Sequence, residues 1–234
     1  MGSTTYRDAL RQALSDCMTA DSSVVLIGEE VGRYGGAYGV TKGLIDEFGS
    51  ERVIDTPISE PSIVGTAVGA AMSGLRPVAE LMYVDFIGMT MDQLANQAAK
   101  IRYMFGGQIG VPMVLRTQGG TGRSAGAQHS QSLEAYVMHT PGLRLVMPAT
   151  VSDAYHLLRQ SLAQPDPVVF IEHKALYSTS GKLDDQVPVA PWGKAHVARQ
   201  GNDLVIVTYS RQLHYAISAA ETLAKDGIDA TIID

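Results

Sequence analysis

Short apolar runs alternate along the chain with stretches in which apolar residues recur every three or four positions. The runs are typical of short strands, many of them buried on both faces, and they lie at residues 24–27, 52–55, 77–83, 111–116, 143–147 and 168–171. The periodic stretches are typical of helices, and they lie at 5–19, 61–74, 91–105 and 154–162. Strands separated by helices predict an α/β fold with a mainly parallel sheet and helices on both faces.

The composition changes near residues 178–194, where Ser, Thr, Gly and Pro replace the apolar pattern. Such a change is typical of a linker between domains. We therefore expect a first domain over residues 1–186 and the start of a second α/β domain over 187–234.

The second unit has its own pattern. A strand is expected at 203–208 and another at 230–233, with a helix between them that Ser210 would cap and Gly227 would end. One strand–helix–strand unit cannot cover both faces of its sheet. We therefore expect this domain to be truncated at Asp234.

Charge and cysteine content narrow the classes of function. The 234 residues include 18 Lys and Arg against 24 Asp and Glu, a net charge of −6 that disfavours nucleic acid and anionic membranes as partners. The single cysteine, Cys17, excludes an internal disulfide and fits a reducing cytosol. No signal peptide and no apolar run of about twenty residues is present. We expect a cytoplasmic protein that does not bind membranes.

Ligands in parallel sheets bind beyond the carboxyl ends of the strands, and one acidic residue follows the strand at 52–55. Glu60 precedes Pro61, a residue that suits the first turn of a helix. Its neighbours Ile58 and Ile63 are apolar, so the carboxyl group is expected to be partly desolvated. Glu60 is therefore a candidate for proton transfer.

One of the six histidines is placed differently from the others. No two of them have the i, i+4 spacing of a helical metal site. His129 follows the long loop after the strand at 111–116, among polar neighbours. This position makes it a candidate site residue.

Small residues give the helix at 61–74 one smooth face. Gly65 and Gly69 lie on it, together with several alanines. Such a face allows close packing on the sheet or against a partner subunit.

A serine hydrolase is an alternative interpretation. Residues 122–126 read GRSAG and match the nucleophile-elbow pattern, with Ser124 as the nucleophile. The elbow requires the serine directly between a strand and a helix, whereas glycines and polar residues separate Ser124 from the preceding strand. The overlapping dinucleotide pattern at 120–125 lacks the acidic residue that would bind the ribose.

Several blocks together resemble the beta subunit of the decarboxylating component of 2-oxo acid dehydrogenase complexes. They are Gly28–Val31, Asp55–Glu60, Glu80–Phe86, Ala127–Gln131 and Pro141–Leu143, in the family's order. The resemblance implies a transketolase-like fold, with this chain supplying the thiamine-diphosphate-binding domain of the pyrimidine type.

The resemblance also implies a cofactor site shared between chains. An alpha subunit holds the diphosphate and Mg²⁺ through a Gly-Asp-Gly…Asn motif, which this sequence lacks. The implied partners are that alpha subunit, a second beta subunit in an alpha2beta2 heterotetramer, and a dihydrolipoyl acyltransferase core. Some family members bind a structural K⁺ through backbone carbonyls near the end of the helix at 151–163, for which a sequence gives no signal.

The family's site residues have matches here. Glu60 matches the glutamate that hydrogen-bonds the aminopyrimidine ring, Met82 and Phe86 match its apolar wall, Ile58 would line the same wall, and Glu29 would stand beside it.

The remaining matches concern substrate and assembly. His129 matches a histidine that interacts with substrate and assists acyl transfer to lipoamide, and Gly65 and Gly69 match the glycines where subunits meet. The implied reaction is cleavage of a carbon–carbon bond in a 2-oxo acid or acetoin, with pyruvate, acetoin and branched-chain substrates all open. A non-catalytic interaction subunit remains a third interpretation.

Overall fold

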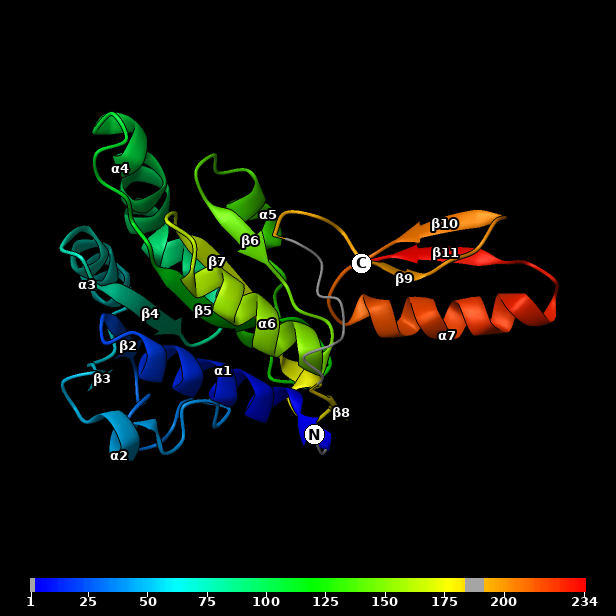
Figure 1. Cartoon of the computed structure of the whole chain (residues 1–234), viewed down its shortest axis with the longest axis horizontal. Coiled ribbons are helices and arrows are strands. Elements are labelled where there is room, and N and C mark those ends of the chain that lie inside the picture. Colours follow the sequence, from blue (N-terminus) through cyan, green and yellow to red (C-terminus); the bar gives the residue numbers. More distant parts are fainter. Residues whose placement is uncertain (1–2, 184–191) are drawn as a thin grey trace.

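A computed structural model describes residues 3–183 and 192–234 (Figure 1). Its centre is a six-stranded sheet in the order β3-β2-β4-β5-β7-β6, and every neighbouring pair is parallel. The strands are β2 (Val24–Gly28), β3 (Val53–Asp55), β4 (Arg76–Leu81), β5 (Val114–Gly119), β6 (Arg144–Val146) and β7 (Val168–His173). The predicted parallel α/β fold is confirmed.

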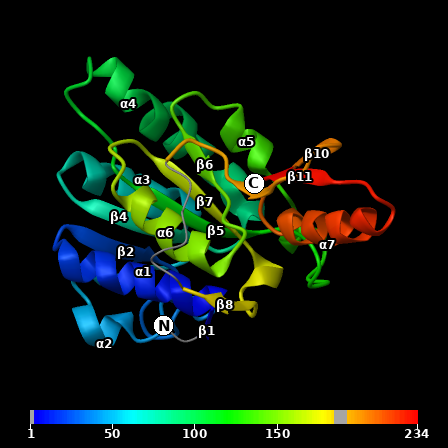
Figure 2. The same ribbon diagram turned by 45° about the vertical axis from the view of Figure 1, so that its right-hand side comes forward.

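Helices cover both faces of this sheet (Figures 1 and 2). One face carries α1 (Tyr6–Ala20) and α6 (Val151–Leu162), which pack side by side. The other carries α3 (Glu60–Met72), the 3₁₀ helix η1 (Val84–Thr90), the π-helical segment η2 (Asp92–Ala98) and α4 (Ala99–Met104). The short helices α2 (Leu44–Phe48) and α5 (Glu134–Met138) lie in connections.

Two cores result from the alternation of side chains along the strands. Leu26 and Val78 belong to the core under α1 and α6, whereas their neighbours Ile27 and Ala79 belong to the core under α3. The strands are buried on both faces, which explains why they read as continuous apolar runs.

Side-chain caps fix where α1 and α6 begin. The Thr5 hydroxyl accepts a hydrogen bond from the Asp8 N–H at 3.1 Å. Thr150 and Asp153 form a reciprocal capping box at the start of α6.

The prediction of a linker at 178–194 is wrong for residues 180–182, which form a strand of the first unit. Residues of β8 (Ser180–Lys182) pair with β1 (Ser3–Thr5) in an antiparallel ladder, with Ser3 opposite Lys182. Strand pairing therefore ties this segment to the first unit. The proposed boundary between residues 186 and 187 lies outside the described residues.

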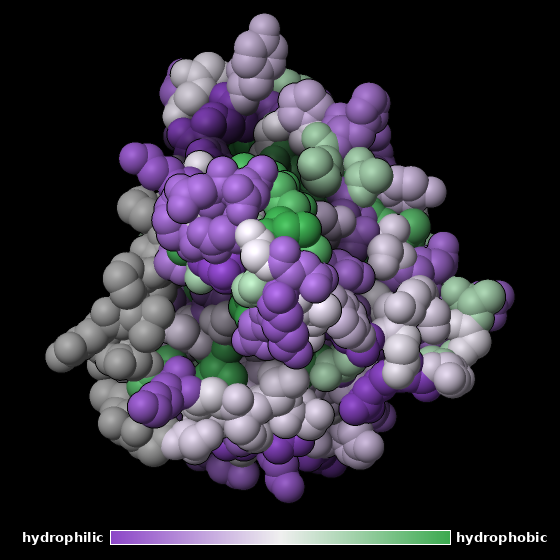
Figure 3. All heavy atoms as spheres, turned by 90° about the vertical axis from the view of Figure 1, so that its right-hand side faces the viewer, coloured by the Kyte–Doolittle hydropathy of each residue, from purple (hydrophilic) through white to green (hydrophobic). Residues whose placement is uncertain are grey.

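The second unit has a sheet of its own in the order β10-β11-β9 (Figure 1). Helix α7 (Gln212–Lys225) packs on it, and its strands are β9 (Val197–Arg199), β10 (Leu204–Val207) and β11 (Ala230–Ile233). The sequence missed β9, which lacks an apolar run and pairs antiparallel with β11. Figure 3 faces this end of the molecule and shows hydrophobic residues exposed between hydrophilic ones.

Two expectations for α7 have different outcomes. Ser210 does not cap the helix: its backbone has a φ of 53°, and its buried hydroxyl has no hydrogen-bond partner among the described residues. Gly227 follows the helix with a φ of 77°, a left-handed conformation that glycine adopts at low cost. The predicted end of the helix is thus confirmed. No helix in the described ranges combines the length and apolar character needed to span a membrane.

Candidate functional site

The strand order creates a natural place for a ligand. β2 and β4 are neighbours in the sheet, and the chain passes from β2 to β3 on one side but from β4 to β5 on the other, so the connections leave this pair of strands in opposite directions. In parallel sheets a crevice forms at such a point, beyond the carboxyl ends of the strands. Glu29 directly follows β2, Glu60 follows β3, and Met82 follows β4. The predicted residues therefore converge from three neighbouring strand ends.

Two buried carboxyl groups are the central feature of this crevice. Glu29 and Glu60 are each 8% exposed. Burial raises the pKa of Glu29, and the negative charges of Glu60 and then Glu30 raise it further. Neither carboxyl group has a hydrogen bond or an ion pair within the described part of the chain. Both are therefore available to a polar ligand.

The position of Glu60 follows from its local sequence. It is the first residue of α3, with Pro61 next, so the helix begins one residue before the predicted start. The preceding Ser59 makes no side-chain cap, and its hydroxyl donates instead to the Ser62 hydroxyl at 2.8 Å. A carboxylate at this end of a helix is favoured by the helix dipole.

The apolar side chains predicted for the site differ in their exposure. Met82 and Phe86 are half-buried, whereas Ile58 is 80% exposed. Phe86 packs against the core under α3. Phe86 is thus anchored to the core, whereas Ile58 presents most of its apolar surface to solvent.

His129 is held between two aromatic rings. Its ring centroid is 4.5 Å from that of Tyr83 and 5.5 Å from that of Phe86, both in edge-to-face geometry. The buried Lys174 ammonium donates a hydrogen bond to the His129 carbonyl and lies 5.3 Å from the centroid of the Tyr83 ring. The structure thus brings His129 and Phe86 together, as the sequence predicted for one site.

The smooth face of α3 is open at its glycines. A Cβ at Gly69 would meet no atom within 4 Å, and one at Gly65 would meet only Gln93 Cγ at 3.5 Å. Together with α4 this face forms an apolar groove of about 380 Å³. Its lining residues are Gly65, Val68, Gly69, Met72, Gln93, Gln97, Ile101, Met104 and Phe105.

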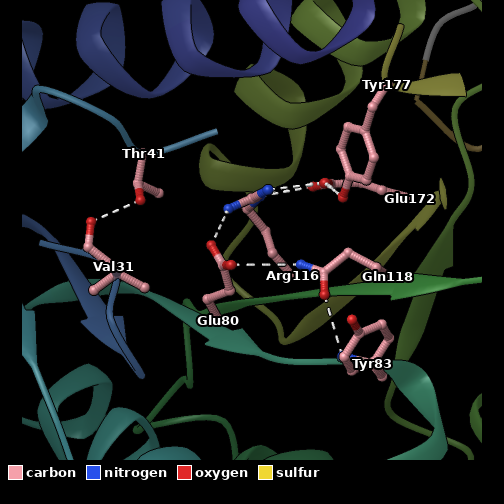
Figure 4. Close-up of polar contacts among 8 residues, drawn as sticks. All are labelled: Val31, Thr41, Glu80, Tyr83, Arg116, Gln118, Glu172 and Tyr177. Atoms are coloured by element: carbon pink, nitrogen blue, oxygen red, sulfur yellow. Dashed lines mark hydrogen bonds and ion pairs between the residues drawn. The ribbon is translucent and has the colours of Figure 1, made fainter. Parts of the chain in front are cut away.

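Sequence reasoning missed a buried ionic network beside the site (Figure 4). Arg116 donates to Glu80 at 2.8 Å and, through two N–H groups, to Glu172 at 2.7 and 2.8 Å. The Tyr177 hydroxyl donates to Glu172 at 2.5 Å. Burial raises the pKa of Glu80, although the Arg116 charge acts against this shift. Charged residues inside apolar strands were the signal that could have revealed the network.

The hydrolase interpretation fails on geometry. Ser124 has a φ of 52°, as an elbow nucleophile can have, but it lies exposed in the loop between β5 and the short 3₁₀ helix Ala127–His129. It is five residues beyond the end of β5 at Gly119, so no strand–serine–helix elbow exists. In the described ranges, no group of three or more His, Cys, Asp or Glu residues could hold a metal ion.

Comparisons with known families support the motif-based resemblance. Residues 2–179 match the transketolase pyrimidine binding domain, and residues 193–234 match the transketolase C-terminal domain. A split-gene transketolase described as an inactive beta4 tetramer has the same fold, with a TM-score of 0.80 and 19% identity over all of this chain and 71% of its own.

Curated relatives are similar over nearly the whole chain. The acetoin:2,6-dichlorophenolindophenol oxidoreductase beta subunit of Cupriavidus necator is 46% identical over 97% of this chain and 70% of its own length. Pyruvate dehydrogenase E1 subunit beta-2 of Oryza sativa, described as mitochondrial, is 47% identical over 98% of this chain and 62% of its own. The 2-oxoisovalerate dehydrogenase beta subunit of Bacillus subtilis is 44% identical over 98% and 70%.

The chain thus spans about six to seven tenths of these relatives. Fold, motif order and identity agree with one another. The chain belongs to the transketolase-like family of beta subunits of pyruvate, acetoin and 2-oxoisovalerate dehydrogenases.

Proposed function

We propose that this chain works with an alpha subunit as a thiamine-diphosphate-dependent 2-oxo acid or acetoin dehydrogenase component. The alpha2beta2 assembly would cleave the substrate's carbon–carbon bond and transfer the acyl group to lipoamide on a dihydrolipoyl acyltransferase core. The buried and unpartnered pair Glu29 and Glu60 at the reversal of strand order is the observation that carries this proposal.

The residues present fit the pyrimidine end of the cofactor. An aminopyrimidine needs a carboxyl group for its ring nitrogen and an apolar surface for its ring. Glu60, after β3, is buried without an internal side-chain partner, and Met82 and Phe86, after β4, are half-buried. Ile58, at 80% exposure, has apolar surface free for contact. When bound, thiamine diphosphate supplies an electron sink for carbon–carbon cleavage.

In this assignment Glu60 holds and exchanges a proton at the aminopyrimidine ring. Burial strengthens such a hydrogen bond because water competes less for the carboxyl group. Glu29 stands beside Glu60, and burial together with the negative charge of Glu60 raises the pKa of its carboxyl group.

His129 would act on the substrate side. Its edge-to-face contacts with Tyr83 and Phe86 orient the ring. The ring is half-buried, so an imidazole nitrogen can reach a substrate that enters from solvent. We assign His129 the binding of substrate and the support of acyl transfer.

The partners complete what this chain lacks. We propose that the alpha subunit holds the diphosphate and Mg²⁺, and that the groove at Gly65 and Gly69 packs against another subunit. The exposed Met72, Met104 and Phe105 around this groove support an interface. We propose the cytosol as the location and leave pyruvate, acetoin and branched-chain 2-oxo acids as candidate substrates.

The test is the activity of Glu60→Gln in the assembly purified with its alpha subunit. We expect a loss of about 100-fold or more in kcat, because the amide cannot exchange the proton. Glu51→Gln, an exposed acid on the loop before β3, is the matched control and should retain full activity.

Two other results would refute the assignment. Full activity of Glu60→Gln would favour a non-catalytic interaction subunit. Loss of activity in Ser124→Ala, with Glu60→Gln active, would favour the hydrolase.

A further inference from the structure

Tyr83, which orients His129, has an unusual backbone conformation. Its φ of 65° and ψ of 130° lie in a region that residues with a side chain rarely adopt. Such a conformation persists only where the surroundings fix it. The Phe86 N–H donates to the Tyr83 carbonyl at 3.1 Å, which closes the turn from β4 into η1. The direction of both aromatic rings beside His129 therefore depends on this turn.

One buried amide holds the other side of the turn. Gln118 on β5 is fully buried, and its Oε1 accepts a hydrogen bond from the Tyr83 N–H at 3.1 Å. Figure 4 shows the Gln118 side chain between Tyr83 and Glu80. The turn is thus fastened to the next strand of the sheet and not only to itself.

The ionic network fixes which way this amide points. Gln118 Nε2 lies 3.5 Å from Glu80 Oε1, and the other oxygen of Glu80 accepts from Arg116 at 2.8 Å. A carboxylate accepts hydrogen bonds, so it must face the NH₂ end of the amide. The oxygen end then faces Tyr83. Gln118 bonds both groups because its side chain is long enough to place an acceptor at the Tyr83 N–H and a donor at the Glu80 carboxylate.

Tyr83 in turn contacts His129 of the proposed site. The Tyr83 ring lies edge-to-face with His129 at 4.5 Å, and Lys174 contacts both residues. A shift of the Tyr83 turn would therefore free one side of the His129 ring. Gln118 has no direct contact with His129 and acts through Tyr83.

We propose that Gln118 is a positioning residue, which holds the Tyr83 turn on the Glu80–Arg116 network and thereby orients His129. The inference rests on the proposed function, since it concerns the orientation of a substrate-binding histidine. Its physical content, however, is the exposure of the His129 ring, which is measured without substrate, cofactor or partner.

The experiment is carbethoxylation of the full chain by diethyl pyrocarbonate, with the rate at His129 measured by peptide mass spectrometry relative to the exposed His139. In Gln118→Met, which keeps the size but loses the acceptor, the rate ratio should rise several-fold. Tyr83→Ala removes the ring and sets the upper value. Thr117→Val is the matched control, because the Thr117 hydroxyl is buried on the same strand without a partner within the described residues.

The outcomes are distinct. An unchanged ratio in folded Gln118→Met overturns the proposal. If that variant does not fold, Gln118→Asn replaces it, because an amide one methylene shorter does not reach the Tyr83 N–H; an unchanged ratio there overturns the proposal equally.

In the assembled enzyme, we expect kcat of Gln118→Met to fall about tenfold with the KM for thiamine diphosphate unchanged. A fall in kcat accompanied by an equally large rise in the KM for thiamine diphosphate would indicate a merely structural role. The labelling result stands whatever the activity proves to be, so failure of the proposed function is recognised separately.

Discussion

Removing the Arg116 charge should destabilise the chain in a pH-dependent way. The Arg116 guanidinium is fully buried and lies within 2.8 Å of carboxylate oxygens on Glu80 and Glu172. Arg116→Met keeps much of the volume and leaves the two carboxylates buried without a counter-charge. Breaking a buried pair in this way costs about 3–5 kcal/mol, because the remaining charges keep their desolvation penalty.

The sign of the pH dependence follows from Glu80. Its pKa in the folded chain is raised above the ordinary 4.5, chiefly by burial. A folded state that binds the proton more tightly loses stability as pH rises from that ordinary value through the raised one. Arg116 lowers the pKa of Glu80, so its removal enlarges the shift. The stability loss in Arg116→Met is therefore smallest near pH 4.5 and greatest at pH 8.

Urea unfolding followed by circular dichroism at pH 5 and pH 8 measures this difference. Arg33→Met, at an exposed site, removes the same charge and should change stability by less than about 0.5 kcal/mol. A loss in Arg116→Met below about 1 kcal/mol at pH 8, or an equal loss at both pH values, would refute the reasoning.

Two further predictions concern glycines. Gly142→Ala should lower the unfolding free energy by about 2 kcal/mol more than Gly74→Ala does. Both glycines have a positive φ, but only at Gly142 would an added Cβ meet backbone, 2.1 Å from the Ala99 oxygen. Equal melting curves for the two variants would contradict this prediction. Gly69→Leu should leave the melting temperature of the isolated chain unchanged within about 2 °C, because a Cβ at Gly69 has open space around it. The same variant should prevent co-purification of a partner subunit. Intact assembly in that variant would exclude the groove as an interface.

The elements that sequence reasoning located best are those with both faces buried. The apolar runs of β2, β5 and β7 and the Thr5 cap of α1 are local signals that the fold retains. By contrast, β8 forms because Ser3–Thr5 lies beside it, and no local pattern encodes a pairing across the whole first unit. Ser210 has the residue type of a cap, but the helix begins beyond it.

In the candidate site, too, residues with a local sequence signal could be predicted, whereas residues that act through long-range contacts could not. Glu60 and His129 could be singled out because they lie in connections beyond the carboxyl ends of strands, where polar residues are often functional. Tyr83 and Gln118 could not, since their importance arises from one hydrogen bond between strands and from an unusual φ. Arg116 stood at the end of an expected strand, and only the register of β4, β5 and β7 brings its two carboxylate partners to it.

The central claim is that this chain contributes only the pyrimidine half of a shared thiamine diphosphate site. The most direct measurement is calorimetric titration of thiamine diphosphate with Mg²⁺ into the chain alone and into the assembly purified with its co-eluting subunit. We expect no binding to the chain alone, near-stoichiometric binding to the assembly, and clearly weaker binding when the assembly carries Glu60→Gln. Tight binding to the isolated chain, or none to the assembly, would contradict it.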